Sequence, residues 1–237
     1  MARPPDAAAR LARALPDIPR WVETRSMLLS GECELLGLEE GEEVSLVARN
    51  TGYPLISVVG RPSEAAIREA AAARRDHEVI VPPENEDLVA TALPGWEGSR
   101  ATLHLLGDEV RIPRVPAGSV RLLEPTELNS IEGLPSNLRS ELASAVQSSP
   151  LAASFEGGRP VAFCYADRTE GLWDVAIDTL EGCRRRGHAA RCVAYMIEHL
   201  RPLRPVWGAE NTNRASLGLA AKLGFVPVDE LLIFRAR

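Results

Sequence analysis

Short apolar runs alternate with helical patterns along the whole chain. In the first part, apolar runs bounded by Gly, Pro and polar residues predict strands at 33–36, 44–48, 55–59, 78–81 and 100–106. Helical patterns predict helices at 7–15, 19–29 and 85–92, and a further helix that begins at Pro62. The alternation of strands and helices predicts a mixed α/β fold.

The second part continues this alternation after a segment rich in turn-forming residues at 112–118. Strands are predicted at 120–123, 152–156, 161–167, 172–179 and 205–208, followed by a final strand pair at 225–228 and 231–235. Helices are predicted at 138–147, 187–200 and 214–223. The segment at 112–118 has the composition of a linker, so we expect one domain over residues 1–115 and another over residues 118–237.

The composition is that of a folded globular protein and argues against several classes of function. Hydrophobic residues make up 45% of the 237 positions, and no run approaches the ~18 apolar residues of a membrane helix. The net charge is −6, whereas nucleic-acid-binding proteins usually carry an excess of basic residues. The first residues lack the apolar core of a secretory signal, so we expect a cytoplasmic protein with no membrane and no nucleic-acid partner.

The cysteines and histidines do not form a metal-binding pattern. Cys33, Cys164, Cys183 and Cys192 have neither CxxC spacing nor zinc-type spacing to a histidine. We therefore expect no metal site.

A basic turn is the strongest candidate for binding chemistry. The run Arg184–Arg186 follows a predicted strand and precedes Gly187, where a helix is predicted to begin. The first N–H groups of a helix have no partner within the helix and lie at its positive end. Gly187 and Ala189 are small enough for a phosphate to approach the backbone closely. The turn therefore predicts a phosphate or pyrophosphate site.

Two motifs in this half resemble the GNAT superfamily of N-acetyltransferases. The pattern Arg184-x-x-Gly187-x-Ala189 resembles the superfamily's pyrophosphate-binding signature. The later run from Asn213 to Phe225, with Lys-Leu-Gly before the phenylalanine, resembles its second helix and exit. The resemblance covers roughly residues 118–237. It implies a mostly antiparallel central sheet flanked by helices, preceded here by a second, smaller α/β domain.

The resemblance implies an N-acetyltransferase that uses acetyl-CoA as co-substrate. The backbone N–H groups of residues 186–191 would hold the pyrophosphate, and the end of the strand at 172–179 would pair with the pantetheine arm. Asn213 would reach the pantetheine, cap the following helix, or do both. The cofactor-binding residues implied in this way are Ile177, Asp178, Thr179, Arg184, Arg185, Arg186, Gly187, His188, Ala189, Ala190, Asn213 and Ser216. We expect His188, at a variable position of the signature, to be exposed.

Direct transfer of an acetyl group to a primary amine needs a base for the amine and a hydrogen-bond donor for the departing thiolate. The candidate bases, in order, are Asp174, Glu210 and Glu170. Many relatives carry a Tyr acid seven residues after the Asn, where this chain has Ala220, so Ser216 is the candidate donor to the sulfur.

Other functions stay open at this point. The alanine at 220 also suits a non-catalytic CoA-binding or regulatory module, and the basic turn suits an interaction protein that recognises a phosphate on another ligand. The negative net charge favours a cationic acceptor, either a small-molecule or a peptide amine. Both a monomer and a homodimer are compatible with the sequence.

The first half follows a similar order of elements, and Asn85 to Trp96 faintly resembles the run after Asn213. It is either a degenerate copy of the same half-fold or an unrelated α/β domain. At the place of the phosphate turn, Pro62 lacks an N–H group and Glu64 would repel phosphate. We therefore expect no CoA there, and a role instead in shaping the acceptor pocket.

Overall fold

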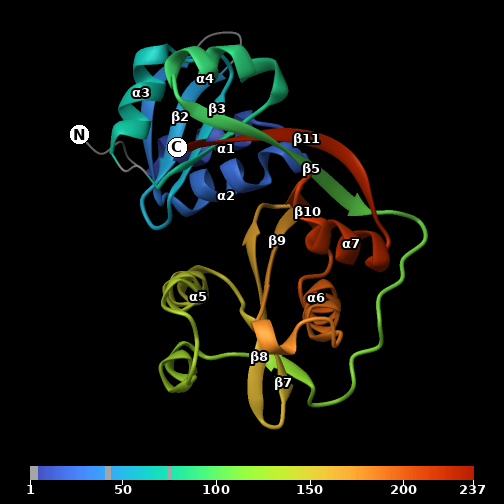
Figure 1. Ribbon diagram of the computed structural model, residues 1–237. Helices are drawn as coiled ribbons and strands as arrows, with labels where there is room; N and C mark the ends of the chain where they lie inside the picture. The colour runs from blue at the N-terminus through green and yellow to red at the C-terminus, as the bar shows by residue number, and fades with distance from the viewer. Residues whose placement is uncertain (1–4, 41–43, 74–75) are drawn as a thin grey trace. The chain divides into compact units, whose positions relative to one another are not determined.

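The computed structural model describes residues 5–40, 44–73 and 76–237 (Figure 1). Contacts divide the chain into two compact units. The first unit comprises residues up to Leu103 together with 208–214 and 227–237, and the second comprises 104–207 and 215–226. This division differs from the expected boundary at 115–118, because the linker lies within the second unit and the chain returns twice to the first.

The first unit is a sheet with helices on both faces. Its sheet order is β1-β2-β3-β4-β11-β5, with β1–β3 antiparallel and β3 parallel to β4. Its elements are α1 (Pro5–Ala14), η1 (Pro19–Trp21), α2 (Val22–Ser30), β1 (Cys33–Glu40), β2 (Val44–Asn50), β3 (Leu55–Val59), α3 (Glu64–Ala72), β4 (Glu78–Val81), η2 (Pro83–Asn85), α4 (Glu86–Ala92) and β5 (Trp96–Leu106), whose last residues belong to the second unit.

The second unit has the sheet order β10-β9-β8-β7-β6, and Figure 1 shows α5 and α6 on opposite sides of its strands. Strands β6 to β9 pair with one another in antiparallel fashion, and β9 pairs with β10 in parallel fashion. Its elements are β6 (Val120–Leu122), η3 (Pro125–Ser130), α5 (Ser136–Ser148), β7 (Ala152–Glu156), β8 (Arg159–Arg168), β9 (Leu172–Thr179), η4 (Glu181–Cys183), α6 (His188–His199), β10 (Arg204–Glu210), α7 (Arg214–Leu223) and β11 (Phe225–Ala236); β10, α7 and β11 also contain residues of the first unit.

The two halves of the sequence repeat one order of elements. Helical segments precede three antiparallel strands in each half, namely β1–β3 and β7–β9. A helix, a parallel strand, a second helix and a further strand follow in both, as α3-β4-α4-β5 and as α6-β10-α7-β11. An internal duplication produces such a repetition, which favours the degenerate copy over an unrelated domain.

Burial explains which elements could be predicted. Strand β3 is apolar except for Ser57, and every residue from Leu55 to Val59 is buried, between one cluster of apolar side chains on α1–α2 and another on α3–α4. Its predicted bounds are confirmed, as are those of β4, β7, β9 and α7.

The final strand pair is a wrong prediction, because β11 is one strand from Phe225 to Ala236. Pro227 and the acidic residues after it resemble a turn in the sequence. In the structure, Asp229 accepts from Arg20 at 2.6 and 2.8 Å, and Glu230 accepts from Arg100 at 3.2 Å. Partners for these carboxylates allow the polar residues to remain in an extended strand.

Gly224 fixes the linker of the second unit to the end of α7. Its φ is +92°, and a Cβ there would lie 2.3 Å from the backbone oxygen of Glu109. Arg111 N donates to Leu223 O at 3.1 Å, and Gly107 N donates to Gly224 O at 2.9 Å. Glycine is required at this position because any side chain would be strained and would displace the linker.

We expect Gly224→Ala to lower the free energy of unfolding by more than about 1 kcal/mol, because it combines a positive φ with a backbone clash. Gly218→Ala, within α7, is the control. No atom lies within 4 Å of the added Cβ there, so this change should be neutral or stabilise by up to about 1 kcal/mol. Urea unfolding of both variants tests the difference, and equal effects would contradict the assigned role of Gly224.

Candidate active site

Strands β9 and β10 pair only briefly. Their parallel register joins Leu172–Asp174 to Arg204–Val206, whereas β9 continues to Thr179 in its pairing with β8. The β10-facing edge of β9 is therefore unpaired from Val175 onward in the described structure. Ile177, Asp178 and Thr179 lie on this stretch and are half-buried.

Helix α6 begins without a side-chain cap. Gly187 precedes it with φ +82°, and Arg185 also has a positive φ of 62°. Arg191 N donates to Gly187 O at 3.1 Å. Within the described residues, the backbone N–H groups from Arg185 to Ala190 donate to no carbonyl or side chain. The unpaired amides are thus those of residues 185–190, whereas the expected range was 186–191.

The three arginines of the turn have different surroundings. Arg186 Nη1 donates to both carboxylate oxygens of Glu156, at 3.0 and 2.9 Å, and this contact lowers the pKa of Glu156. Arg184 Nε donates to Thr179 O at 3.3 Å. Arg185 is exposed, and its side chain contacts no hydrogen-bond or ion-pair partner within the described residues. Arg185 is therefore the arginine most available to an anion.

The expected exposure of His188 is wrong, because only 4% of this residue is accessible. Its Nδ1 lies 2.9 Å from Ser154 Oγ and 2.9 Å from Arg191 Nη2. A guanidinium only donates, so Nδ1 accepts and the neutral ring carries its proton on Nε2. Burial and the nearby Arg191 lower the pKa of His188, which keeps the ring neutral. The ring therefore anchors the first turn of α6 against β7.

The corresponding helix of the first half, α3, starts differently. Ser63 caps it by accepting from Ala66 N at 3.3 Å. A Cβ on Gly37 would lie 2.5 Å from Ala66 Cβ, so β1 packs directly against the first turn. The start of α3 is thus capped and packed against β1, whereas the start of α6 has no side-chain cap.

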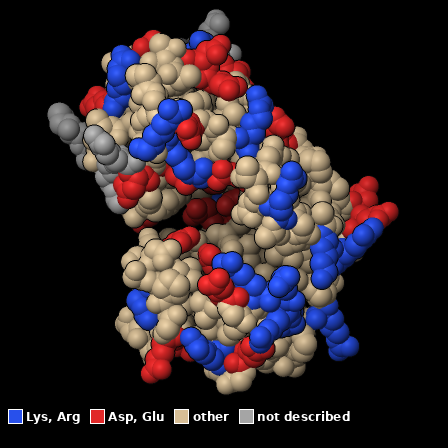
Figure 2. Space-filling view, in the orientation of Figure 1, with Lys and Arg blue, Asp and Glu red and all other residues tan. Residues whose placement is uncertain are grey.

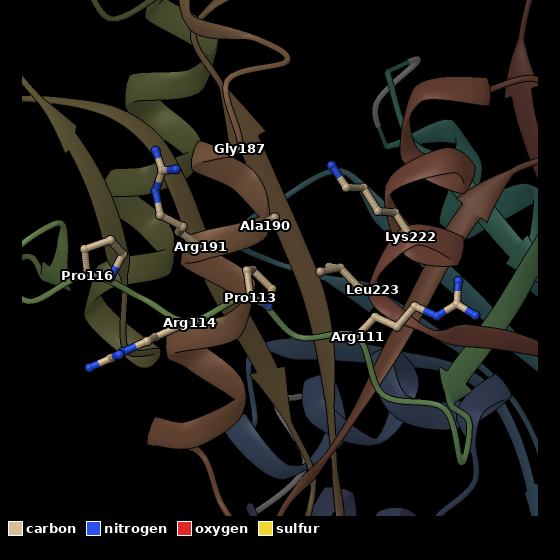
Figure 3. Close-up of a pocket in the computed structure, with 9 residues that line it drawn as sticks. All are labelled: Arg111, Pro113, Arg114, Pro116, Gly187, Ala190, Arg191, Lys222 and Leu223. Atoms are coloured by element: carbon tan, nitrogen blue, oxygen red, sulfur yellow. The ribbon is translucent and has the colours of Figure 1, made fainter.

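A cavity of about 210 Å³ adjoins the start of α6 (Figure 3). Its lining residues are Arg111, Pro113, Arg114, Pro116, Gly187, Ala190, Arg191, Lys222 and Leu223. Figure 3 shows the Lys222 side chain extending toward the α6 side of the cavity. Basic side chains also gather over the α6 region of the second unit in Figure 2.

The donors at this place fit a diphosphate. Besides the unpaired amides, Arg191 Nε is buried and has no hydrogen-bond partner within the described residues. The glycine at 187 leaves its left-handed turn without a Cβ that would shield the amides. Unpaired amides, cationic side chains and a positive helix end are the groups that bind phosphates in proteins.

Carboxylates share one face of β8 and β9. Asp174 lies directly opposite Asp167, and Asp178 lies four residues further along β9, on the same face. Burial and the facing Asp167 raise the pKa of Asp174 to about 7, and burial with Glu141 raises the pKa of Asp178. Two facing carboxylates cannot both ionise readily, so the pKa of Asp174 lies near neutrality.

The other candidates have less suitable surroundings. Glu210 belongs to the first unit, where it accepts from Arg235 and Ser99 at 2.7 Å each; these contacts lower its pKa and weaken it as a base. Asn213 also belongs to the first unit and directly precedes α7. Glu170 is exposed.

Ser216 and Ala220 lie on α7 in the second unit. Ser216 Oγ accepts from Trp207 Nε1 at 2.9 Å, which directs the hydroxyl proton away from the indole. Ala220 is fully buried, so a tyrosine would not fit there without rearrangement. Of the candidates, the structure brings Asp174, the end of β9, residues 184–190 and Ser216 into one unit, whereas Glu210 and Asn213 belong to the other.

Sequence reasoning singled out neither Asp167 and Arg114 nor the side chains of Arg191 and Lys222. The one available signal was that Lys222 is the only lysine of the chain. The helices within residues 5–40, 44–73 and 76–237 are all too short or too polar to cross a membrane.

Comparisons with known proteins agree with this geometry. Residues 155–234 match the family model described as GNAT acetyltransferase. Among curated proteins, none matches the chain.

Several solved structures share the fold over nearly the whole chain. A GCN5-related N-acetyltransferase-like protein from Streptococcus suis is 18% identical, with a TM-score of 0.69 over 98% of this chain and 99% of that one. A GNAT-family acetyltransferase described as putative, from Novosphingobium aromaticivorans, is also 18% identical, with a TM-score of 0.58 over 93% and 98%. A tandem GNAT protein from the clavulanic acid biosynthesis pathway is 16% identical, with a TM-score of 0.54 over 97% and 92%.

The expected fold class is therefore confirmed, and so is the resemblance that the two motifs indicated. The family match supports acyl transfer as the general activity. The chain has the GNAT fold, and its residues 155–234 match the GNAT acetyltransferases.

Proposed function

We propose that the protein is an N-acetyltransferase that moves an acetyl group from acetyl-CoA directly to a primary amine, and that the second unit carries the reaction. The observation that most supports this proposal is the open start of α6, where the N–H groups of residues 185–190 have no partner in the described structure. The unpaired edge of β9 in the same unit supports it independently.

Each part of the co-substrate has candidate partners in this chain. The amides of residues 185–190, with Arg185, would bind the pyrophosphate. The backbone from Ile177 to Thr179 would pair with the pantetheine as an added strand. When bound, acetyl-CoA would supply a thioester whose carbonyl carbon bonds to the neutral amine nitrogen. The carbon–sulfur bond breaks, CoA leaves as a thiolate, and the nitrogen gives one further proton to water as it becomes the amide.

Asp174 is the proposed general base. An alkylamine is protonated at neutral pH and must lose a proton before its nitrogen can react. A carboxylate with a pKa of about 7 accepts that proton far better than an ordinary aspartate. Asp167 has a positioning role, because its charge helps to keep the pKa of Asp174 high.

Ser216 is the proposed donor to the departing sulfur. Its oxygen already accepts from Trp207, so its own proton is directed elsewhere. A hydroxyl stabilises a thiolate by donating a hydrogen bond while it keeps its own proton. The thiolate then takes a proton from water.

The acceptor is proposed to be a cationic amine, either a small molecule or part of a peptide. Asp167, Asp174 and Asp178 share the β8–β9 face, and Tyr165 on this face donates its hydroxyl to Glu141 of α5. A negatively charged face attracts an ammonium group and raises its local concentration.

A non-catalytic CoA-binding module is the second candidate. The observation that favours it is the fully buried Ala220 at the position where many relatives carry a tyrosine acid. Turnover of acetyl-CoA with a panel of primary amines separates the two functions, since a binding module would release no CoA with any amine.

We expect Gly187→Leu to weaken binding of acetyl-CoA at least roughly tenfold, because a side chain would block approach to the amides. Gly157→Leu is the matched control for backbone strain. Gly157 also has a positive φ, at 56°, and no atom lies within 4 Å of its added Cβ. Calorimetric titration of both variants isolates the binding effect, and equal affinities would rule out the turn as the pyrophosphate site.

We expect kcat to rise with pH through about 7 and then level off, because Asp174 accepts a proton only when it is ionised. Asp174→Asn should lower kcat roughly 100-fold or more and remove this dependence. Asp167→Asn should keep activity but move the rise to lower pH, because the facing negative charge is gone. A pH profile of Asp167→Asn that coincides with the wild type would contradict the assigned coupling.

A further inference from the structure

The linker closes the cavity beside α6 and adds positive charge to it. Arg111 N is held by Leu223 O at 3.1 Å, and the linker then continues through Pro113, Arg114 and Pro116 along the cavity wall. The cavity is lined by four cationic residues, namely Arg111, Arg114, Arg191 and Lys222, and by no carboxylate.

Two of these cations have no partner of their own. Arg111 pairs with the exposed Glu109 at 2.8 Å, and Arg191 lies against His188. No hydrogen bond or ion pair joins the side chain of Arg114 or of Lys222 to another residue in the described ranges. Like charges around one cavity repel each other, so the arrangement is relieved by a bound anion.

The position of the cavity indicates which anion it takes. It begins at Gly187 and Ala190, where the pyrophosphate is proposed to bind, and extends to Lys222 at the end of α7. CoA carries a further phosphate on its ribose, at the 3′ position, on the nucleotide side of the pyrophosphate. A volume of about 210 Å³ accommodates such a group, since a water molecule takes up only ~30 Å³ of liquid.

We propose that this cavity binds the 3′-phosphate of CoA, and that Lys222 and the linker residue Arg114 thereby select CoA thioesters over thioesters that lack this phosphate. The inference rests on the proposed use of acetyl-CoA. It assigns to the linker between the two halves a part in donor selection.

Calorimetric titration of the full chain with CoA and with 3′-dephospho-CoA tests the proposal. The wild type should bind CoA more tightly. Lys222→Gln and Arg114→Gln should each weaken CoA binding roughly five- to tenfold, as expected for one charged hydrogen bond at a partly exposed site, and should leave dephospho-CoA binding unchanged. Arg201→Gln removes the same charge from an exposed arginine that does not line the cavity, and it should change neither affinity.

Lys222 permits a second readout because it is the only lysine of the chain. An amine-acylating reagent can modify only this side chain and the α-amino group, which serves as an internal reference. Mass spectrometry should show that CoA protects Lys222 more than an equal concentration of dephospho-CoA or of inorganic phosphate. Equal protection by inorganic phosphate would show a general anion site and overturn the assignment to CoA.

The outcomes separate this inference from the function on which it rests. Equal affinities of the wild type for CoA and dephospho-CoA would overturn the 3′-phosphate site and leave the acetyltransferase proposal standing. If neither ligand binds, both proposals are overturned. A preference for CoA that persists unchanged in Lys222→Gln and Arg114→Gln would also contradict the site.

Discussion

The structure of the second unit depends on how the chain enters α6. The positive φ angles at Arg185 and Gly187 leave the amides of residues 185–190 without partners in the described structure. Two contacts from β7 stabilise this unusual start, since Glu156 binds Arg186 and Ser154 contacts His188. At an exposed turn, unpaired amides cost little folding free energy, because water accepts their hydrogen bonds when no ligand is bound. Unpaired amides at the start of a helix are groups that bind phosphates in proteins, and the proposed function depends on them.

The two halves show how one order of elements is used in two ways. In the first half, Ser63 caps α3 and Ala66 packs against Gly37, so a side-chain cap and β1 cover part of that helix start. In the second half, the capping side chain is absent and a glycine stands before the helix. A few residues at the helix start thus distinguish the two halves.

Local sequence patterns predicted the helices and strands well, because burial patterns and turns depend on residues that are close together in the sequence. The mostly apolar segment Leu55–Val59 is an example, because it is buried on both faces of its sheet. The same reasoning failed where contacts between residues far apart in the sequence determine the local structure. The turn-like sequence at Asp229 remains extended because Arg20 binds it, and His188 is buried because Ser154, 34 positions away, contacts its ring. The phosphate turn, which follows from spacing, stays a prediction, whereas the place of Lys222 beside the linker is visible only in three dimensions.

Thermal unfolding of the full chain with acetyl-CoA, and with ATP and pyrophosphate as controls, tests the central claim most directly. A ligand that binds only the native state raises the unfolding midpoint by mass action. The account predicts a larger rise with acetyl-CoA than with an equal concentration of either control, because acetyl-CoA also contacts the β9 edge and the cationic cavity. An unchanged midpoint at about 1 mM acetyl-CoA would contradict the account.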